Sequence, residues 1–168
     1  NGTDLFVLGS QNIYHIDTSA STPTANIIYT VTSGDFFLVS LTANGSLLYF
    51  VVENYIEATD TFLGTKIFML DTNNIASVTE IFSSPNYIIA LTNNGNTIYF
   101  NEEVLLNPPN FEPFENDIKK IEDSGSNLET ILSGLDTGVT RGMSFNNGLL
   151  YLSSSDDNIL YSIDLSQG

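Results

Sequence analysis

The sequence predicts an all-β fold, a propeller-like array of about four four-stranded antiparallel units in which the first and the last are incomplete. Two observations predict it. Short segments rich in Ile, Val, Leu, Tyr and Phe alternate with Gly, Asn, Ser and Asp along the whole chain, a pattern typical of strands joined by turns. The same order of features recurs about every fifty residues, which indicates one repeated supersecondary unit.

Three independent features carry this period. Asn-Gly pairs occur in three of the units and begin at Asn44, Asn94 and Asn147. Strand-centre aromatic residues stand at Phe6, Tyr49, Tyr99 and Tyr151, and strand-ending acids stand at Asp17, Asp71, Glu122 and Asp164. Because the features keep the same order in each period, we expect each complete unit to hold four strands, a to d in chain order.

Fourteen strands are expected, and the first unit lacks strand a while the last lacks strand d. In chain order they are Leu5–Leu8, Ile13–Asp17, Ile27–Val31, Phe36–Leu41, Leu47–Val52, Lys66–Asp71, Val78–Phe82, Tyr87–Leu91, Thr97–Phe100, Asp117–Glu122, Leu128–Leu132, Thr140–Phe145, Leu149–Leu152 and Ile159–Asp164. We expect the open edges of the first and last strands to be covered by the rest of a longer polypeptide or by strands of adjacent copies.

The turn residues have a mechanical explanation. A two-residue type I′ turn needs positive φ at both central positions, which Asn tolerates and Gly adopts freely, so Asn-Gly is expected to join strands a and b. The acid that ends strand c is expected to accept backbone N–H groups of the following turn, a structural task rather than ligand binding.

The repeated unit resembles a blade of a β-propeller, in particular of the TolB, NHL, YVTN and gluconolactonase-like superfamily. The resemblance is carried by GLLYLSSSDDNILYSIDLSQG at Gly148–Gly168, IYHIDTS at Ile13–Ser19 and IFMLDTN at Ile67–Asn73, whereas IKKIED at Ile118–Asp123 departs by placing lysines where aromatic residues stand. It implies a single propeller-like domain or propeller section with blades at 1–32, 33–83, 84–133 and 134–168. Propellers host unrelated functions, so the resemblance implies architecture alone.

No catalytic, cofactor or metal-binding residue is predicted. His15 is the single histidine and stands in an alternating strand without a G-x-S-x-G motif. Gluconolactonase-like relatives hold a divalent metal with Glu, Asn and Asp from several blades, and no such set can be matched here. Asp156-Asp157, and Glu122-Asp123 with Asn127, offer oxygen ligands for calcium, but neither matches a dedicated calcium loop, and solvated turn acids are the simpler interpretation.

Two long insertions give the best functional clue. They join strands b and c at Glu53–Thr65 and Asn101–Asn116, and in a propeller both would emerge on one face. Both mix apolar and acidic residues, and apolar loop residues must pack either on the blades or on a partner. The candidate partner-binding residues are Tyr55, Phe62, Phe111 and Phe114.

Composition restricts the partners. Four Lys and Arg against 20 Asp and Glu give a net charge of −16, which repels nucleic acid and anionic lipid surfaces. No apolar segment is long enough to insert in a membrane as a helix, and the absence of cysteine excludes thiol chemistry and disulfides. The partners expected are other protein chains or copies of this chain.

The predicted function is a non-enzymatic β-propeller module that acts in protein assembly or ligand binding, as a subunit of a larger ring or filament. The alternative is a section of a lactonase-like hydrolase or lyase with a metal-dependent site. Low Lys content and an acidic pI favour an extracellular or cell-surface location, with periplasmic and cytoplasmic locations as alternatives. Asn1 and Asn44 fit the N-glycosylation sequon.

Overall fold

The computed structural model describes residues 3–31, 36–59, 61–105, 114–135, 140–154 and 159–166. Over these residues the chain forms strands joined by turns, with a single 3₁₀ turn. The elements are β1 (Asp4–Leu8), β2 (Asn12–Asp17), β3 (Ala25–Thr30), β4 (Phe36–Asn44), β5 (Leu47–Ile56), η1 (Glu57–Thr59), β6 (Thr61–Asp71), β7 (Val78–Ser84), β8 (Tyr87–Asn94), β9 (Thr97–Leu105), β10 (Phe114–Glu122), β11 (Glu129–Leu135), β12 (Thr140–Asn146), β13 (Leu149–Ser154) and β14 (Leu160–Asp164).

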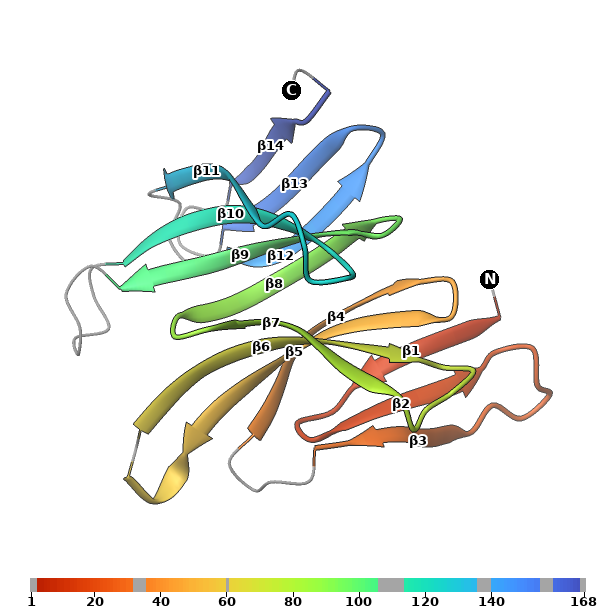
Figure 1. The fold of residues 1–168 in the computed structure, drawn as a ribbon. Helices are drawn as coiled ribbons and strands as arrows, with labels where there is room; N and C mark the ends of the chain where they lie inside the picture. The colour runs from red at the N-terminus through yellow and green to blue at the C-terminus, as the bar shows by residue number, and fades with distance from the viewer. Residues whose placement is uncertain are drawn as a thin grey trace.

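The strands form four antiparallel sheets, as predicted. Sheet 1 holds β1–β3, sheet 2 holds β4–β7, sheet 3 holds β8–β11 and sheet 4 holds β12–β14, and in each sheet strands that follow one another along the chain are hydrogen-bonded neighbours. The leading strands of the last three sheets lie side by side, β4 next to β8 and β8 next to β12. The sheets therefore form a series whose two ends are sheet 1 and sheet 4 (Figure 1).

A hydrophobic core fills each space between neighbouring sheets. Because side chains alternate across a strand, β5 contributes to two of these cores. Leu48, Phe50 and Val52 pack toward sheet 1, whereas Tyr49 and Val51 pack toward sheet 3. Strands buried on both faces explain why the sequence of β5 reads as a continuous apolar run.

The hairpin turns differ in part from the prediction. Asn147 and Gly148 both have positive φ, 50° and 81°, as a type I′ turn requires. In the other two hairpins Asn44 pairs with Leu47 and Asn94 with Thr97, so each Asn is the last strand residue. The first central residues are then Gly45 and Gly95, at φ 61° and 57°, and the residues after them are not in the positive-φ region, which is the type II′ pattern.

The strand-ending aspartates act as predicted. The Oδ1 atoms of Asp17, Asp71 and Asp164 each accept the backbone N–H two residues further on, at 2.9 Å in all three turns. For Asp17, hydrogen bonds from the Ser19 side chain and backbone lower the pKa. Glu122 departs from this pattern: its longer side chain instead accepts a hydrogen bond from Thr97 Oγ1 at 3.3 Å.

Candidate interaction surfaces

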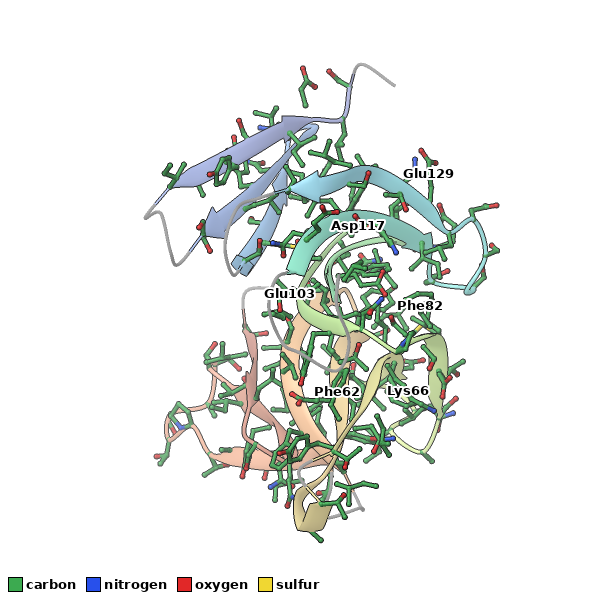
Figure 2. The ribbon with its side chains drawn as sticks, turned by 90° about the vertical axis from the view of Figure 1, so that its left-hand side faces the viewer. Phe62, Lys66, Phe82, Glu103, Asp117 and Glu129 are labelled. Carbon is green, nitrogen blue, oxygen red and sulfur yellow. The ribbon has the colours of Figure 1, made fainter. Side chains whose placement is uncertain are left out.

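Over the described residues, both insertions lengthen the β-hairpins that they join. In sheet 2, β5 continues to Ile56 and β6 begins at Thr61, with η1 at the tip. In sheet 3, β9 continues to Leu105 and β10 begins at Phe114. We call the surface formed by residues 53–59, 61–65, 101–105, 114–117 and the connection 84–87 the extension face. Figures 1 and 2 show that both extensions project on the same side of the molecule, as the repeat predicts.

A buried carboxylate fastens this face together. Glu102 is only 3% exposed, and its carboxylate accepts hydrogen bonds from Ser84 Oγ and Lys119 Nζ and a longer one, 3.3 Å, from Asn86 Nδ2. Burial alone would raise the pKa of Glu102, but these donors and the charge of Lys119 outweigh it, and the pKa is lowered. Glu102 is therefore an ionised carboxylate that ties the connection between sheets 2 and 3 to β10.

The sheet 2 extension rests on the same connection. The Phe62 ring stacks on the Tyr87 ring, with centroids 3.7 Å apart and planes 15° apart. Thr65 Oγ1 donates a hydrogen bond to the Asn86 carbonyl oxygen at 2.7 Å. Gly64 has φ 122°, and a Cβ there would lie well inside contact distance of the Ser84 carbonyl oxygen. The close approach requires glycine.

The extension face still presents apolar groups to solvent. Tyr55, which pairs with Phe62 across the hairpin, is half-buried, and Leu63, in the register shift between this pair and the Asn54–Gly64 pair, is 50% exposed. Phe111 and the Phe114 side chain lie outside the described residues, so the structure brings together only Tyr55 and Phe62 of the predicted set. Leu63 was not among the predicted contacts, although it follows Phe62 directly in the insertion and is apolar.

The extension face also contains acidic and amide groups at its base. Burial raises the pKa of Glu53, which pairs with Thr65 at the base of the extension. On the side of sheet 3 that faces sheet 4, Asn101 Nδ2 donates a hydrogen bond to Asn116 Oδ1 at 3.0 Å, and both residues are buried. Figure 2 labels Glu103 and Asp117 on this face together with Phe62.

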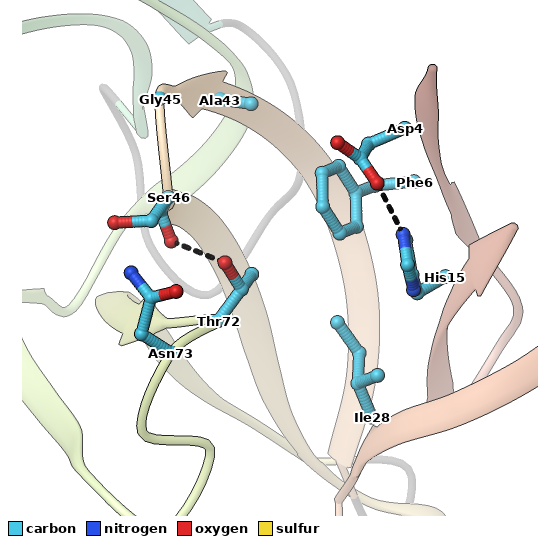
Figure 3. Close-up of a pocket in the computed structure, with 9 residues that line it drawn as sticks. All are labelled: Asp4, Phe6, His15, Ile28, Ala43, Gly45, Ser46, Thr72 and Asn73. Carbon is cyan, nitrogen blue, oxygen red and sulfur yellow. Dashed lines mark hydrogen bonds and ion pairs between the residues drawn. The ribbon is translucent and has the colours of Figure 1, made fainter. Parts of the chain in front are cut away.

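A separate pocket of about 410 Å³ lies between sheets 1 and 2 (Figure 3). His15 Nε2 lies 2.7 Å from Asp4 Oδ1, and the Phe6 ring stacks on the imidazole with centroids 5.2 Å apart. Ser46 stands on the opposite wall, where its carbonyl oxygen accepts a hydrogen bond from Thr72 Oγ1 at 2.9 Å. Among the described residues that line the pocket, a His–Asp pair is present but no hydrogen bond joins His15 to Ser46, so they form no Ser–His–Asp arrangement.

The structure also bears on the candidate metal ligands, glycosylation sites and membrane segments. Over the described residues, no three His, Asp or Glu side chains gather in a group that could hold a metal ion, and Asp156-Asp157 lies outside them. Asn1 also lies outside the described residues, while Asn44 is partly exposed beside the turn glycine. A helix able to cross a membrane is absent from the described part of the chain.

Neither a protein-family model nor a curated protein sequence matches the chain. The chain does match solved structures. A protein assigned as TolB from Agrobacterium tumefaciens matches with a TM-score of 0.60 and 14% identity over 96% of this chain and 55% of that one. The nidogen–laminin complex matches with a TM-score of 0.51 and 8% identity over 97% of this chain and 74% of the other.

An oligogalacturonate lyase from Vibrio parahaemolyticus matches with a TM-score of 0.50 and 12% identity, over 98% of this chain and 60% of the lyase. The chain thus spans little more than half the length of the TolB and lyase chains. At these identities the likeness concerns the fold alone. Together with the four sheets in series, it shows that the chain has a β-propeller repeat architecture.

Proposed function

We propose that this chain is a non-enzymatic β-propeller module, displayed outside the cell or on its surface, that acts in protein assembly by presenting the extension face to a basic protein partner. The observation that carries the proposal is the geometry of that face. Two paired-strand extensions project beyond the sheets, are fastened by a buried carboxylate, and expose Leu63 and part of Tyr55. Apolar groups that are exposed together and rimmed by polar residues mark surfaces that bind other proteins.

Charge supports a basic partner. Each of the three lysines already has a carboxylate of this chain within 4.0 Å: Lys66 pairs with Glu80, Lys119 with Glu102, and Lys120 with Glu129. The carboxylates in excess of these pairs give the molecule a strongly negative potential, which attracts and orients cationic partners. One of the similar structures is itself a protein–protein complex, that of nidogen with laminin.

Self-association into a ring or filament belongs to the same proposal, as does a location outside the cell. The low lysine content and the acidic pI of about 4.1 support that location. The four aromatic residues Tyr55, Phe62, Phe111 and Phe114 remain the proposed partner contacts, and Leu63 joins them.

The test uses lysine-rich peptides that carry one leucine or phenylalanine, with affinity measured by calorimetry. Replacing Tyr55 and Leu63 with Ser should weaken binding at least about tenfold while leaving the free energy of unfolding within about 1 kcal/mol. Leu128→Ser is the matched control, since Leu128 is exposed to the same extent but lies between β10 and β11. Equal loss in the control, or no binding by the unmodified chain, would overturn the proposal.

Phe62 needs a separate variant because its ring already stacks on Tyr87. We expect Phe62→Ser to lower both affinity and stability, and Phe62→Leu to recover stability without full affinity. A Phe62→Ser variant with native stability would mean that the stack contributes little to holding the extension.

A further inference from the structure

The faces of sheet 1 and sheet 4 that point away from the other sheets can be compared with their repeat equivalents. Cross-strand pairing fixes the equivalence: Leu5 pairs with Ile16 as Leu48 does with Leu70, Ile98 with Ile121, and Leu150 with Ile163. The same registers align the strand-b residues Val7, Phe50, Phe100 and Leu152, and the strand-c residues Ile13, Ile67, Ile118 and Leu160.

In strand b, two positions point toward the preceding sheet. Leu48, Ile98 and Leu150 occupy the first and are each 0% exposed, whereas Leu5 is 48% exposed. Phe50, Phe100 and Leu152 occupy the second and are at most 1% exposed, whereas Val7 is 39% exposed. Leu5 and Val7 of sheet 1 therefore occupy positions whose equivalents in sheets 2, 3 and 4 are all covered by the preceding sheet.

In strand c, one position points toward the following sheet. Ile13, Ile67 and Ile118 occupy it and are each 0% exposed, whereas Leu160 in sheet 4 is 67% exposed. The outward face of sheet 4 thus exposes the position that every other sheet buries against its successor.

The three uncovered positions, two on strand b and one on strand c, belong to one kind of sheet-on-sheet contact. Ile13 lies in the same core as Leu48 and Phe50, Ile67 in the same core as Ile98 and Phe100, and Ile118 in the same core as Leu150 and Leu152. In all three interfaces the strand-c residue of one sheet therefore packs with the two strand-b residues of the next. The fourth set with this pattern is Leu160 with Leu5 and Val7, which stand at opposite ends of the series.

We propose that two copies of this chain associate head to tail, with Leu160 of one copy packed on Leu5 and Val7 of the next. The contact continues the sheet-on-sheet packing seen three times within the chain. This inference rests on the assembly part of the proposed function, but it uses a surface distinct from the extension face. Because the two contact patches differ, the association is heterologous: it closes into a ring or extends as a chain, according to the rotation between copies.

Sedimentation equilibrium of the 168-residue chain at physiological ionic strength tests the proposal, from micromolar concentration upward. The unmodified chain should show concentration-dependent association. Leu160→Lys and Val7→Glu should each weaken it at least about tenfold. Ile75→Lys is the control, because Ile75 is also a well-exposed aliphatic residue but lies in the β6–β7 connection, and this change should leave association unaltered.

Mixing the Leu160→Lys and Val7→Glu variants tests the proposed contact more directly. A Leu160→Lys chain presents an ammonium group to the carboxylate that the Val7→Glu substitution introduces in the other chain. In the mixture, the unmodified Leu160 of the Val7→Glu chain also meets the unmodified Leu5 and Val7 of the Leu160→Lys chain, which restores one native contact. An equimolar mixture should therefore associate at one-to-one stoichiometry, although each variant alone is weakened. A chain that stays monomeric at every concentration, a mixture that does not pair, or an equal effect of Ile75→Lys would overturn the proposal. A monomer would leave these faces to other residues of a longer polypeptide.

The two proposals fail separately. Tyr55 and Leu63 variants should lose peptide binding and retain self-association, whereas Leu160 and Val7 variants should do the reverse. Circular dichroism of each variant checks that the fold is retained, as expected for substitutions at exposed positions.

Discussion

The buried ion pair of the extension face makes a quantitative prediction. Glu102→Gln removes the charge but keeps a side chain of the same shape. The carboxylate now accepts hydrogen bonds from Ser84, Lys119 and Asn86, and the Lys119 side chain is 17% exposed. After the substitution, the ammonium group keeps only Asp117, 3.6 Å away, as a charged partner among the described residues.

The expected loss of stability depends on the groups that still compensate the charge of Lys119 after the substitution. Removing one partner of a buried ion pair costs about 3–5 kcal/mol when the other charge is left uncompensated. Here Asp117 and partial exposure compensate Lys119, and the Gln oxygen still accepts a hydrogen bond from Ser84. We therefore expect Glu102→Gln to lower the free energy of unfolding by about 2–3 kcal/mol, below the full cost of an isolated charge. The double variant Glu102→Gln with Lys119→Met should lie within about 1 kcal/mol of the unmodified chain, because an apolar replacement removes the stranded charge.

Urea unfolding followed by circular dichroism at neutral and acidic pH measures these effects. Because the folded-state pKa of Glu102 is lowered, its carboxylate contributes stability above the unfolded-state pKa near 4.5, and this contribution is lost as pH falls through the lower folded-state pKa. The Glu102→Gln variant should lose less stability on acidification than the unmodified chain. A neutral-pH change under about 0.5 kcal/mol, or a double variant no better than the single one, would refute the assignment of Glu102 as a fastening carboxylate.

Three further predictions concern single residues. Gly64→Ala should cost about 2 kcal/mol or more in urea unfolding, because its positive φ and the Ser84 carbonyl oxygen both exclude a Cβ, whereas Gly45→Ala should cost less since a Cβ there meets nothing within 4 Å. Glu53→Gln should raise stability at neutral pH: the raised folded-state pKa means that stability present in acid is lost as pH rises through that pKa, and the neutral amide avoids the loss. Expression through a glycosylating export route should add a glycan at Asn44, seen as an intact-mass increase that Asn44→Gln removes; an unchanged mass would contradict it.

The sequence was sufficient for the sheets because each strand of the repeat is bounded by turn residues and carries its own apolar pattern. It was not sufficient for the extensions. The expected strands stopped at Val52 and Phe100, where Glu53 and Asn101 interrupt the apolar run, yet pairing continues because each extension is held by its partner strand and by contacts with residues 84–87. Such support comes from residues far along the chain, which a local pattern does not contain.

The turns show the same limit on a smaller scale. Asn-Gly predicts positive φ, but whether Asn lies inside the turn depends on the strand register. Asn147 lies inside it, whereas Asn44 and Asn94 close their strands one residue earlier. For the candidate site, the grouping of the insertions could be predicted from the repeat. The Phe62–Tyr87 stack and the Glu102 network could not, because they join residues from different sheets.

All three lysines already pair with carboxylates of this chain, and a large excess of negative charge remains. This excess makes the two proposed contacts respond oppositely to salt. Copies of a chain with a net charge of −16 repel one another, and added salt screens this repulsion, since the Debye length falls from about 10 Å at 0.1 M to about 3 Å at 1 M. Apolar packing of sheet 4 on sheet 1 should therefore strengthen as salt rises. Attraction of a basic partner to the extension face should weaken over the same range. The ionic strength around the protein would then decide which of the two assemblies predominates.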